Sequence, residues 1–559
     1  MRVGSRSRLS IPTILIVLSL SLLAGSCQLV TSLVKNDGER VKTERPPRPA
    51  PGQPNLIIFA LDGVGHDQLM EALSAGEMPN LAGVLGPPRG ADLFAHAYSV
   101  PRTVSMMPSS TVADWSAVFT GLPPAWNGLP GDEWFDRSTL RFFAPVPITV
   151  TESADFEAML IDDLVGKQLK VPTLYEQLAL RTNVSMQMVH RGASVYTILP
   201  PASILDFIDE FVAGEMEGED SHQSVSGVID TQSVAKAIKA LDQHGIPALQ
   251  TVYFPGIDIY THASPNPLTS QVNYLATVTD PAIGQVLAAY RRQGGLANAY
   301  VIVIADHGNT PVRNDARHDL GVGQETRGSL WQVLAASGFR VRPPVLKLAA
   351  ADAATYQAVI ASQGFIANIY LADRATCEQA GSSCDWSEPP RLERDVMPAV
   401  RALYRASHRG HGYLAGTIDL IFARPPVAAG REALPFEIYD RGRLVPIPEY
   451  LERHPRPDLV QLNRRMRWLG AGPYGNRAGD IVLLARTGLN RPQSKRYYFA
   501  AKGHWSFHGS ASIQDSYVPF IVAQVGGSGA AMKREVAAVL HGPPSQMAVT
   551  PLALRLLNQ

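Results

Sequence analysis

The sequence predicts an α/β fold, in which a doubly wound and mostly parallel sheet carries helices on both faces and an inserted cap. Three observations predict it: continuous apolar runs recur along the chain, helical patterns separate them, and one long irregular stretch interrupts the alternation. Unbroken apolar runs are typical of strands that are buried on both faces of a parallel sheet. Strands that alternate with helices are typical of doubly wound domains.

The first strand is expected at Asn55–Leu61, an apolar run that ends in Asp62-Gly63. Helices are expected at Thr279–Arg292 and at Pro172–Leu180, where the proline occupies a first turn that tolerates it. Further runs, expected to form the other buried strands, lie at 249–254, 300–305, 481–485 and 518–523.

The chain has 559 residues, more than a single hydrophobic core usually supports, so we expect a large domain with a substantial insertion. The irregular stretch, with its Pro-rich breaks, is predicted to be the inserted cap. The predicted organisation is 1–27 as a leader, 28–54 as a Pro-rich tether, 55–340 as the first part of the core, 341–478 as the cap and 479–559 as the final part of the core.

The leader has the pattern of an export signal. Arginines at positions 2, 6 and 8 precede the apolar run Ile11–Leu23, and the run leads through Ala24-Gly25-Ser26 to Cys27. This resembles a bacterial lipobox, so we expect lipidation at Cys27, with a plain signal peptide or an uncleaved membrane anchor as alternatives. Because Gln28 follows and not Asp, an exported, periplasm-facing lipoprotein of the outer membrane is favoured over one of the inner membrane.

The other two cysteines, Cys377 and Cys384, lie in one short polar stretch. Outside the cytoplasm such a pair forms a local disulfide. A metal site is the alternative, but no neighbouring Cys or His offers further ligands. We therefore favour the disulfide.

The balance of charged residues indicates which kinds of partner the protein is expected to bind. Lys and Arg number 50, and Asp and Glu number 50, so the chain lacks the basic surplus of a nucleic-acid-binding protein. Duplex nucleic acid is not expected as a partner. An acidic small-molecule substrate would have to be attracted locally, by a metal ion or by the end of a helix.

Three predicted strands end in or near an aspartate, namely Asp62, Asp258 and Asp306. In open α/β sheets ligands bind outside the carboxyl ends of the strands, where such carboxylates would repel one another without a cation between them. Carboxylate and imidazole groups form a ligand set that zinc accepts. Each of these residues alone has an ordinary interpretation, as a helix cap or a surface group, but their joint order favours a metal site. The accompanying histidines are His262, His307 and His508.

The candidate nucleophile is Thr111, which begins a predicted helix that runs to Thr120 and is stopped by Gly121 and two prolines. Its ordinary interpretation is a helix N-cap. The functional interpretation is a hydroxyl at the positive end of a helix and in contact with a metal, both of which lower its pKa. The helix amides would also receive phosphate oxygens. Ser110 is the nearest rival.

Taken in order, these motifs resemble those of the alkaline phosphatase superfamily, and most closely its type I phosphodiesterase/nucleotide pyrophosphatase branch. The resemblance covers most of the chain outside the leader and the cap, and it implies an alkaline-phosphatase-like fold. The motifs are Leu61-Asp62-Gly63, Met78-Pro79-Asn80-Leu81, Thr111 with Thr120-Gly121-Leu122-Pro123, Asp258 with His262, Ala305-Asp306-His307-Gly308 and His508-Gly509.

The resemblance also implies a mechanism and two sets of metal ligands. Thr111 would attack phosphorus and form a phosphothreonine, from which water releases the product. His504 is an alternative to His508 as a ligand. The two Zn2+ ions would be held by Asp62, Thr111, Asp306 and His307, and by Asp258, His262 and His508.

One position departs from the phosphodiesterase pattern. Where that branch has an Asn that donates to a phosphate oxygen, this chain has Asp132. A carboxylate cannot donate unless it is protonated, and it would repel a phosphate. Asp132 could bind a further cation, contact a cationic group of the substrate, or turn outward.

Other members of the same scaffold fit less well. A sulfatase needs a Cys/Ser-x-Pro-x-Arg motif that the segment around Thr111 lacks, a phosphoethanolamine transferase has several membrane spans, and a cofactor-independent phosphoglycerate mutase acts in the cytoplasm. A surface lipoprotein with a vestigial site is the non-enzymatic alternative. A phosphomonoesterase would use the same site with extra cationic groups, for which Arg409 and Lys502 are examples.

Overall fold

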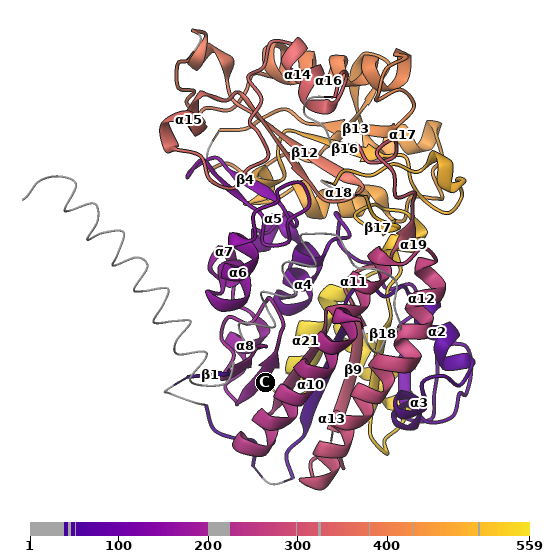
Figure 1. The fold of residues 1–559 in the computed structure, drawn as a ribbon. Helices are drawn as coiled ribbons and strands as arrows, with labels where there is room; N and C mark the ends of the chain where they lie inside the picture. Colours follow the sequence, from indigo (N-terminus) through magenta and orange to yellow (C-terminus); the bar gives the residue numbers. More distant parts are fainter. Residues whose placement is uncertain are drawn as a thin grey trace, which may run out of the picture.

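A computed structural model gives the fold, and two sheets form two lobes that lie one above the other (Figure 1). Cys27 and the rest of the predicted leader lie outside the described residues. Within the described part of the chain, no helix is both long and apolar enough to span a bilayer. The structure describes residues 39–42, 46–50, 52–199, 224–297, 299–321, 326–379, 381–428, 430–500 and 503–558.

The lower lobe is built on an eight-stranded sheet of order β1-β7-β6-β8-β2-β9-β18-β3. Its centre is parallel, because β7, β6, β8, β2 and β9 pair in parallel, while β1, β18 and β3 pair antiparallel at the two edges. The strands are β1 (Glu39–Val41), β2 (Asn55–Leu61), β3 (Ala97–Ser99), β6 (Thr182–Ser185), β7 (Val195–Thr197), β8 (Leu249–Phe254), β9 (Ala299–Ala305) and β18 (Phe520–Gln524).

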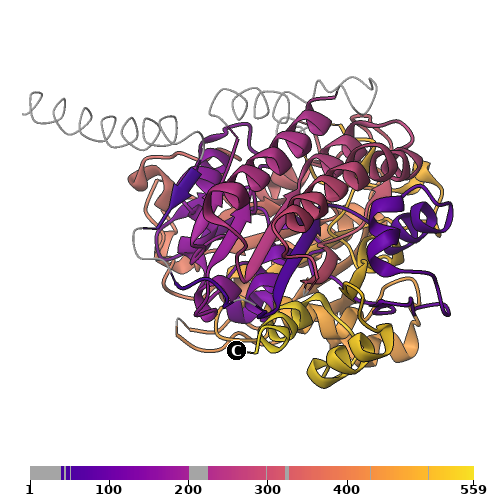
Figure 2. The ribbon, with the colours of Figure 1, turned by 90° about the horizontal axis from the view of Figure 1, so that it is seen from below.

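Helices cover both faces of this sheet, as the view from below also shows (Figure 2). Alternate residues of β2 enter the two cores, with Ile58 in one and Phe59 in the other. The first face carries α4 (Thr111–Thr120), α6 (Ala154–Ile161), α8 (Leu174–Gln177), α20 (Gly529–Val539) and α21 (Val549–Leu556). The second face carries α2 (His66–Ser74), α3 (Pro79–Leu85), α10 (Val225–His244), α12 (Pro267–Tyr274) and α13 (Asp280–Arg292). The predicted doubly wound, mostly parallel α/β fold is confirmed.

The upper lobe is a second layered unit. Its six-stranded sheet has the order β11-β12-β16-β13-β14-β15 and is antiparallel throughout. The strands are β11 (Ala358–Ser362), β12 (Ile366–Leu371), β13 (Ile418–Ala423), β14 (Glu437–Asp440), β15 (Arg443–Pro446) and β16 (Ile481–Ala485). Its helices include α14 (Leu330–Ala336), α15 (Ala350–Thr355), α16 (Met397–Tyr404), α17 (Ile447–Arg453) and α18 (Leu462–Gly470).

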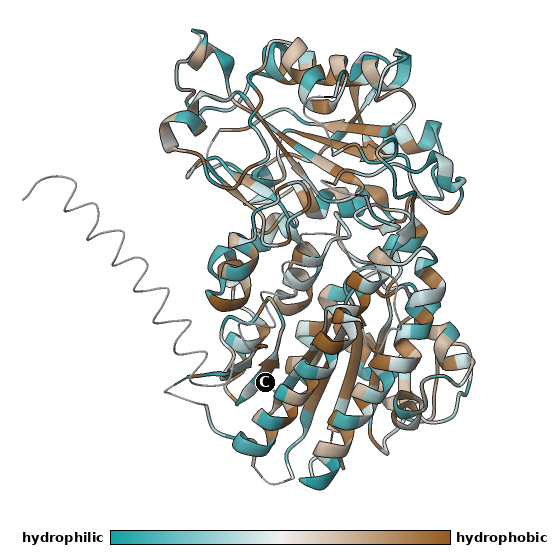
Figure 3. Cartoon of the chain, in the orientation of Figure 1, coloured by the Kyte–Doolittle hydropathy of each residue, from teal (hydrophilic) through white to brown (hydrophobic). Residues whose placement is uncertain are grey.

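The prediction that the core resumes at residue 479 is wrong for β16. This strand lies in the middle of the upper sheet, with Leu483 packed against α14 and α16 and Leu484 packed toward α17 and α18. The strand centres of both lobes are accordingly apolar (Figure 3). A strand covered on both faces has the same apolar run in either lobe, so the run could not assign β16 to one of them.

Two predicted helices have different outcomes. The helix expected at Thr279–Arg292 is α13, preceded by a π-helical turn, η1 (Leu275–Thr279). The helix expected at Pro172–Leu180 is only the short α8, because Thr173 caps its first turn through a capping box and β6 begins a few residues later. Other short elements include α5 (Pro124–Asn127), α7 (Leu164–Gln168), α11 (Gly256–Ala263), α19 (Ile513–Ser516), β4 (Trp134–Asp136), β5 (Arg141–Phe143), β10 (Thr310–Pro311) and β17 (Ser506–Phe507).

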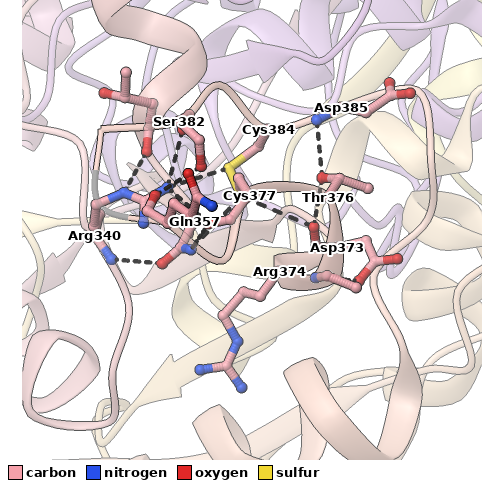
Figure 4. The surroundings of a disulfide bond; sticks show 12 residues. Arg340, Gln357, Asp373, Arg374, Thr376, Cys377, Ser382, Cys384 and Asp385 are labelled. Carbon is pink, nitrogen blue, oxygen red and sulfur yellow. Dashed lines mark hydrogen bonds between the residues drawn. A yellow bond between two sulfur atoms is a disulfide. The ribbon is translucent and has the colours of Figure 1, made fainter.

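Cys377 and Cys384 form a disulfide in the upper lobe (Figure 4). Both cysteines are buried, and the Gln357 amide and the Arg340 guanidinium lie against the loop that the bond closes. The Arg340 side chain donates to the carbonyls of Cys377 and Ser382. The loop is therefore fixed from both sides by a covalent bond and by hydrogen bonds.

Candidate active site

The three aspartates predicted to form a site do meet at the carboxyl edge of the lower sheet. Asp62 follows β2 and Asp306 follows β9, two neighbouring parallel strands whose last residues, Leu61 and Ala305, are paired. Asp258 lies in α11, which follows β8 on the other side of β2. All three carboxylates are buried. The site lies at the end of the sheet that faces the upper lobe (Figure 1).

One cluster consists of Asp62, Asp306 and His307, whose ligand atoms all lie within 4.8 Å of one another. The Nε2 atom of His307 is 3.7 Å from Oδ1 of Asp62 and 3.4 Å from Oδ2 of Asp306. These two carboxylate oxygens accept no hydrogen bond from any described residue, although both are buried. Buried acceptors that face one another without a donor are stable only if a cation or a proton lies between them.

A second cluster surrounds Asp258. Its Oδ2 atom is 3.0 Å from Nε2 of His262 and 3.9 Å from Nε2 of His508. His307 belongs to this cluster as well, since ligand atoms of Asp258, His307 and His508 also lie within 4.8 Å of one another. The His307 and His508 rings are stacked, with their centroids 3.6 Å apart. His307 therefore stands between the two predicted ligand sets.

The three histidines share one orientation. In each, Nδ1 lies against a backbone carbonyl: His262 against Ser506, His307 against Gly308 and His508 against Ser109. A carbonyl can only accept, so Nδ1 carries a proton in each ring. Contacts of this kind at the second ring nitrogen orient metal-binding histidines. In His307 and His508, whose pKa values are lowered by burial, Nε2 keeps its lone pair. Nε2 of His262 lies 3.0 Å from Oδ2 of Asp258; although burial alone would lower the pKa of His262, this carboxylate raises it, so without a cation the nitrogen donates to the carboxylate.

The electrostatics of the clusters agree with this geometry. Burial, reinforced by the neighbouring carboxylates, raises the pKa of Asp62 well above its ordinary value, and burial does the same for Asp306. Burial lowers the pKa of His307 to about 4, and it lowers that of His508 well below the ordinary value. Although burial alone would raise the pKa of Asp258, the surrounding histidines lower it. Without a cation, the clusters are stable only with protons on acids that would otherwise be charged.

Gly63 lies against the carboxylate of Asp258. Its backbone φ is +67°, and a Cβ atom at this position would lie 2.0 Å from Oδ1 of Asp258. Only glycine fits, for both reasons. Asn309 was not predicted: its side-chain amide donates to Oδ1 of Asp258 at 2.6 Å and to the Gly63 carbonyl at 3.1 Å. It lies close behind His307 in the chain, which is the signal that could have found it.

Thr111 is the first residue of α4 and faces both clusters. Its hydroxyl oxygen is 3.2 Å from Nε2 of His307, and its side chain lines the pocket that opens onto the site. The helix begins and ends at the predicted residues, with Gly121 in the left-handed conformation at its end. Ser110, the rival nucleophile, is fully buried as the residue before the helix and does not belong to the described lining of the pocket.

Asp132 turns inward, so the prediction that it could turn outward is wrong. It is fully buried, and its Oδ1 atom accepts a hydrogen bond of 2.9 Å from the backbone N–H of Val112. Its own N–H donates to the side chain of Gln363, from the upper lobe. Burial raises its pKa to about 7. The carboxyl group thus occupies one of the helix amides that were expected to receive a phosphate oxygen.

A buried arginine of the upper lobe supports the segment before the nucleophile. Arg465, in α18, is fully buried and donates to the hydroxyls of Ser109 at 2.6 Å and of Ser105 at 3.1 Å. Ser109 in turn holds His508 through its carbonyl. No sequence pattern marks this residue, because an arginine on an amphipathic helix is ordinarily exposed.

The remaining candidates lie at the edge of the site or away from it. His504 is half-buried and its ring contacts those of His262 and Phe507, whereas His508 is buried within the Asp258 cluster. Arg409 packs on Tyr404 in the upper lobe and does not line the pocket, and Lys502 lies outside the described residues.

The donor set therefore fits divalent cations: buried carboxylate oxygens without donors and imidazole lone pairs that converge on them, with a threonine hydroxyl beside them. Aspartate and histidine ligands together are accepted by zinc. The donors form two groups that share His307.

Comparisons with known proteins identify the family. The sequence model described as type I phosphodiesterase / nucleotide pyrophosphatase matches residues 56–372, more than half of the chain. Murine ectonucleotide pyrophosphatase/phosphodiesterase 5 aligns with a TM-score of 0.49 and 12% identity, over 90% of this chain and 95% of that one. An inactive variant of that murine protein, in complex with AMP, aligns with a TM-score of 0.49 and 13% identity over the same shares. No curated protein matches the chain. The chain belongs to the type I phosphodiesterase/nucleotide pyrophosphatase family, a branch of the alkaline phosphatase superfamily, and is a hydrolase of phosphoric ester bonds.

Proposed function

We propose that this enzyme hydrolyses phosphodiesters in two steps, through a phosphothreonine on Thr111. In the first step the Thr111 oxygen forms a bond to phosphorus, the bond from phosphorus to the leaving oxygen breaks, and the departing alcohol takes up a proton. In the second step water forms a bond to phosphorus, the bond to Thr111 breaks, and the threonine oxygen takes up a proton. The products are an alcohol and a phosphate monoester.

The position of the Thr111 hydroxyl carries this proposal. It lies at the first residue of α4, where the helix dipole favours negative charge, and 3.2 Å from Nε2 of His307. The His307 lone pair is directed at it because Nδ1 lies against the Gly308 carbonyl. The residue is 5% exposed and lines an open pocket, so a substrate reaches it while most water is excluded.

Two Zn2+ ions belong to the proposal. Bound there, they would neutralise the carboxylates and lower the pKa of the Thr111 hydroxyl and of the attacking water. Asp62, Thr111, Asp306 and His307 would hold one ion, and Asp258, His262 and His508 the other. This division is supported because Asp62 and Asp306 belong to one group of close ligand atoms, whereas Asp258 and His508 belong to the other. His307 belongs to both groups, so the two groups are neighbours.

We also propose that the enzyme is an exported lipoprotein attached to the outer membrane, facing the periplasm, through Cys27. The support is the leader pattern in the sequence. Fractionation of a Cys27→Ser variant tests this: we expect it to leave the membrane fraction, and continued membrane attachment would contradict lipidation at this residue.

The test of the reaction uses the purified protein with bis(p-nitrophenyl) phosphate, p-nitrophenyl phosphate and p-nitrophenyl sulfate. We expect the diester to be the best substrate and Thr111→Ala to lower kcat by at least about 10³-fold, because the nucleophile is lost. Thr120→Ala, at the other end of the same helix, is the matched control and should keep its activity. Near-normal turnover by Thr111→Ala would refute the nucleophile, and a preference for the monoester would favour a phosphomonoesterase.

Metal content is measured on the same preparations. Asp306→Ala should lower the bound zinc, because it removes a buried carboxylate from one cluster, whereas Thr111→Ala should keep most of it. Unchanged metal in Asp306→Ala would contradict the ligand assignment. A wild-type protein that neither binds zinc nor hydrolyses any ester would indicate a vestigial site.

A further inference from the structure

A largely apolar pocket opens directly onto the Thr111 hydroxyl and is not explained by the reaction itself. The half-buried Val146 and Pro147 and the exposed Thr151 lie along one side of it. Beyond the metal-binding candidates, its wall is formed mainly by side chains of α6, of α11 and of the segment after β6, namely Phe156, Met159, Leu160, Met186, Met188 and Ile259.

The chemistry of this wall restricts what can fill it. No lysine or arginine occurs among the described residues that line the pocket, so a ligand with charges beyond the reacting phosphate would find no counter-charge there. Three of the lining residues are methionines, whose unbranched side chains adapt to flexible apolar partners. Met159, Met186 and Met188 are each nearly fully buried, with 1%, 2% and 4% exposure.

A nucleobase suits the wall poorly. A base needs flat aromatic faces for stacking and polar partners at its edge. The aromatic residues Phe156, Tyr253 and Phe507 come from three separate elements, α6, β8 and β17. Apart from the two clusters, Thr111 and His504, the polar side-chain groups of the described lining are the hydroxyl of the exposed Thr151 and the Tyr253 hydroxyl, which already donates to Asp62.

We propose that the pocket binds an alkyl or acyl chain of the substrate, so that the preferred substrate is a phosphodiester with one long, flexible apolar group. This inference rests on the proposed diester hydrolysis and specifies its substrate class. The chain extends from the phosphate bound at Thr111 across Met159 and Ile259 toward Met186 and Met188. Transfer of each methylene from water to this wall strengthens binding.

The experiment measures how the rate depends on chain length. The full chain, in mild detergent at constant concentration, is given p-nitrophenyl esters of methyl, butyl and hexyl phosphate and of thymidine 5′-phosphate. We expect kcat/KM to rise about two- to fourfold per methylene, and so by at least about thirtyfold over the five methylenes that separate methyl from hexyl. The thymidine ester should be hydrolysed less efficiently than the hexyl ester. A smaller rise, or a thymidine ester that is preferred, would overturn the inference.

Variants of a pocket residue test whether the alkyl chain of the substrate binds in this pocket. Met159→Gln puts an amide of similar length into the wall, and we expect it to lower the hexyl-to-methyl ratio of kcat/KM by at least about threefold. Met532→Gln, in α20, makes the same change at a residue of matching burial that does not line the pocket, and should leave the ratio unchanged. Met159→Leu keeps the site apolar and should keep the ratio. An unchanged ratio in a folded Met159→Gln would overturn the assignment.

Binding without turnover separates this inference from the proposed function. Calorimetry should show hexyl phosphate binding at least about tenfold more tightly than methyl phosphate to the wild-type protein. If no ester is hydrolysed but this difference in affinity is found, the proposed hydrolysis is refuted and the binding of an alkyl chain in the pocket is supported. If all esters are hydrolysed equally and the difference in affinity is absent, the proposed hydrolysis is supported and the binding of an alkyl chain in the pocket is refuted.

Discussion

Replacing Gly63 by alanine tests whether the carboxylate of Asp258 must stay where it is. The added Cβ would lie 2.0 Å from Oδ1 of Asp258 and 2.7 Å from the side-chain nitrogen of Asn309, and Cβ atoms essentially never approach other atoms within 3.0 Å. The carboxylate must therefore move by at least about 1 Å. It would leave its contact of 3.0 Å with His262, and the Asn309 amide that orients it would be displaced as well.

The expected effect has two parts. Alanine at φ +67° costs about 1–2 kcal/mol of folding free energy, because its Cβ crowds the following carbonyl. The shift of Asp258 adds a loss of metal affinity of roughly 10- to 100-fold, the range found when groups that orient metal ligands are changed. Gly76 gives a matched control, since its φ is +76° and nothing lies within 4 Å of its Cβ position.

The assay is a zinc competition titration on Gly63→Ala and Gly76→Ala, with thermal unfolding in the presence of chelator. Both variants should lose similar thermal stability from the backbone strain, but only Gly63→Ala should bind zinc more weakly and lose kcat/KM. If Gly63→Ala binds zinc as tightly as Gly76→Ala does, the position of Asp258 is not critical and the reasoning is refuted.

Two more predictions concern buried charges. Arg465→Met should lower the free energy of unfolding by about 3–5 kcal/mol, because buried acceptors and the nearby carboxylates lose their cation, and Arg465→Lys should lower it less. Urea unfolding checks this, and an unchanged midpoint for Arg465→Met would contradict it. Burial raises the pKa of Asp132 from 3.8 to about 7, so the stability that this carboxyl contributes is present below about pH 4 and is lost as the pH rises through about 7. With chelator present, the melting temperature of Asp132→Asn should therefore rise relative to wild type across this range, and a constant difference would count against it.

Much of the site could be predicted because strand ends meet at one edge. Asp62 and Asp306 follow adjacent parallel strands, and each strand was visible as an apolar run. Thr111 was visible because a helix start and a glycine stop bracket its helix. His508 follows no predicted strand, since the segment around it contains only the very short strand β17, and its place in a ligand set came from the resemblance to the family.

What could not be predicted depends on long-range contacts. Arg465 lies 356 positions from the Ser109 hydroxyl to which it donates, and nothing near it in sequence marks it as buried. The inward turn of Asp132 depends on Gln363, from the other lobe. The assignment of β16 failed for a related reason: burial on both faces leaves the same sequence pattern whichever lobe supplies the two layers.

The antiparallel pairing of β9 with β18 has a consequence for how the protein is made. β9 ends at residue 305, and its neighbour begins only at residue 520, after the whole upper lobe. During synthesis one side of β9 lacks its partner until nearly the entire chain has emerged, and an unpaired apolar strand edge readily pairs with other chains. Truncation shortly before residue 520 should thus leave an aggregation-prone intermediate, in which two of the three aspartates already stand at the ends of paired strands.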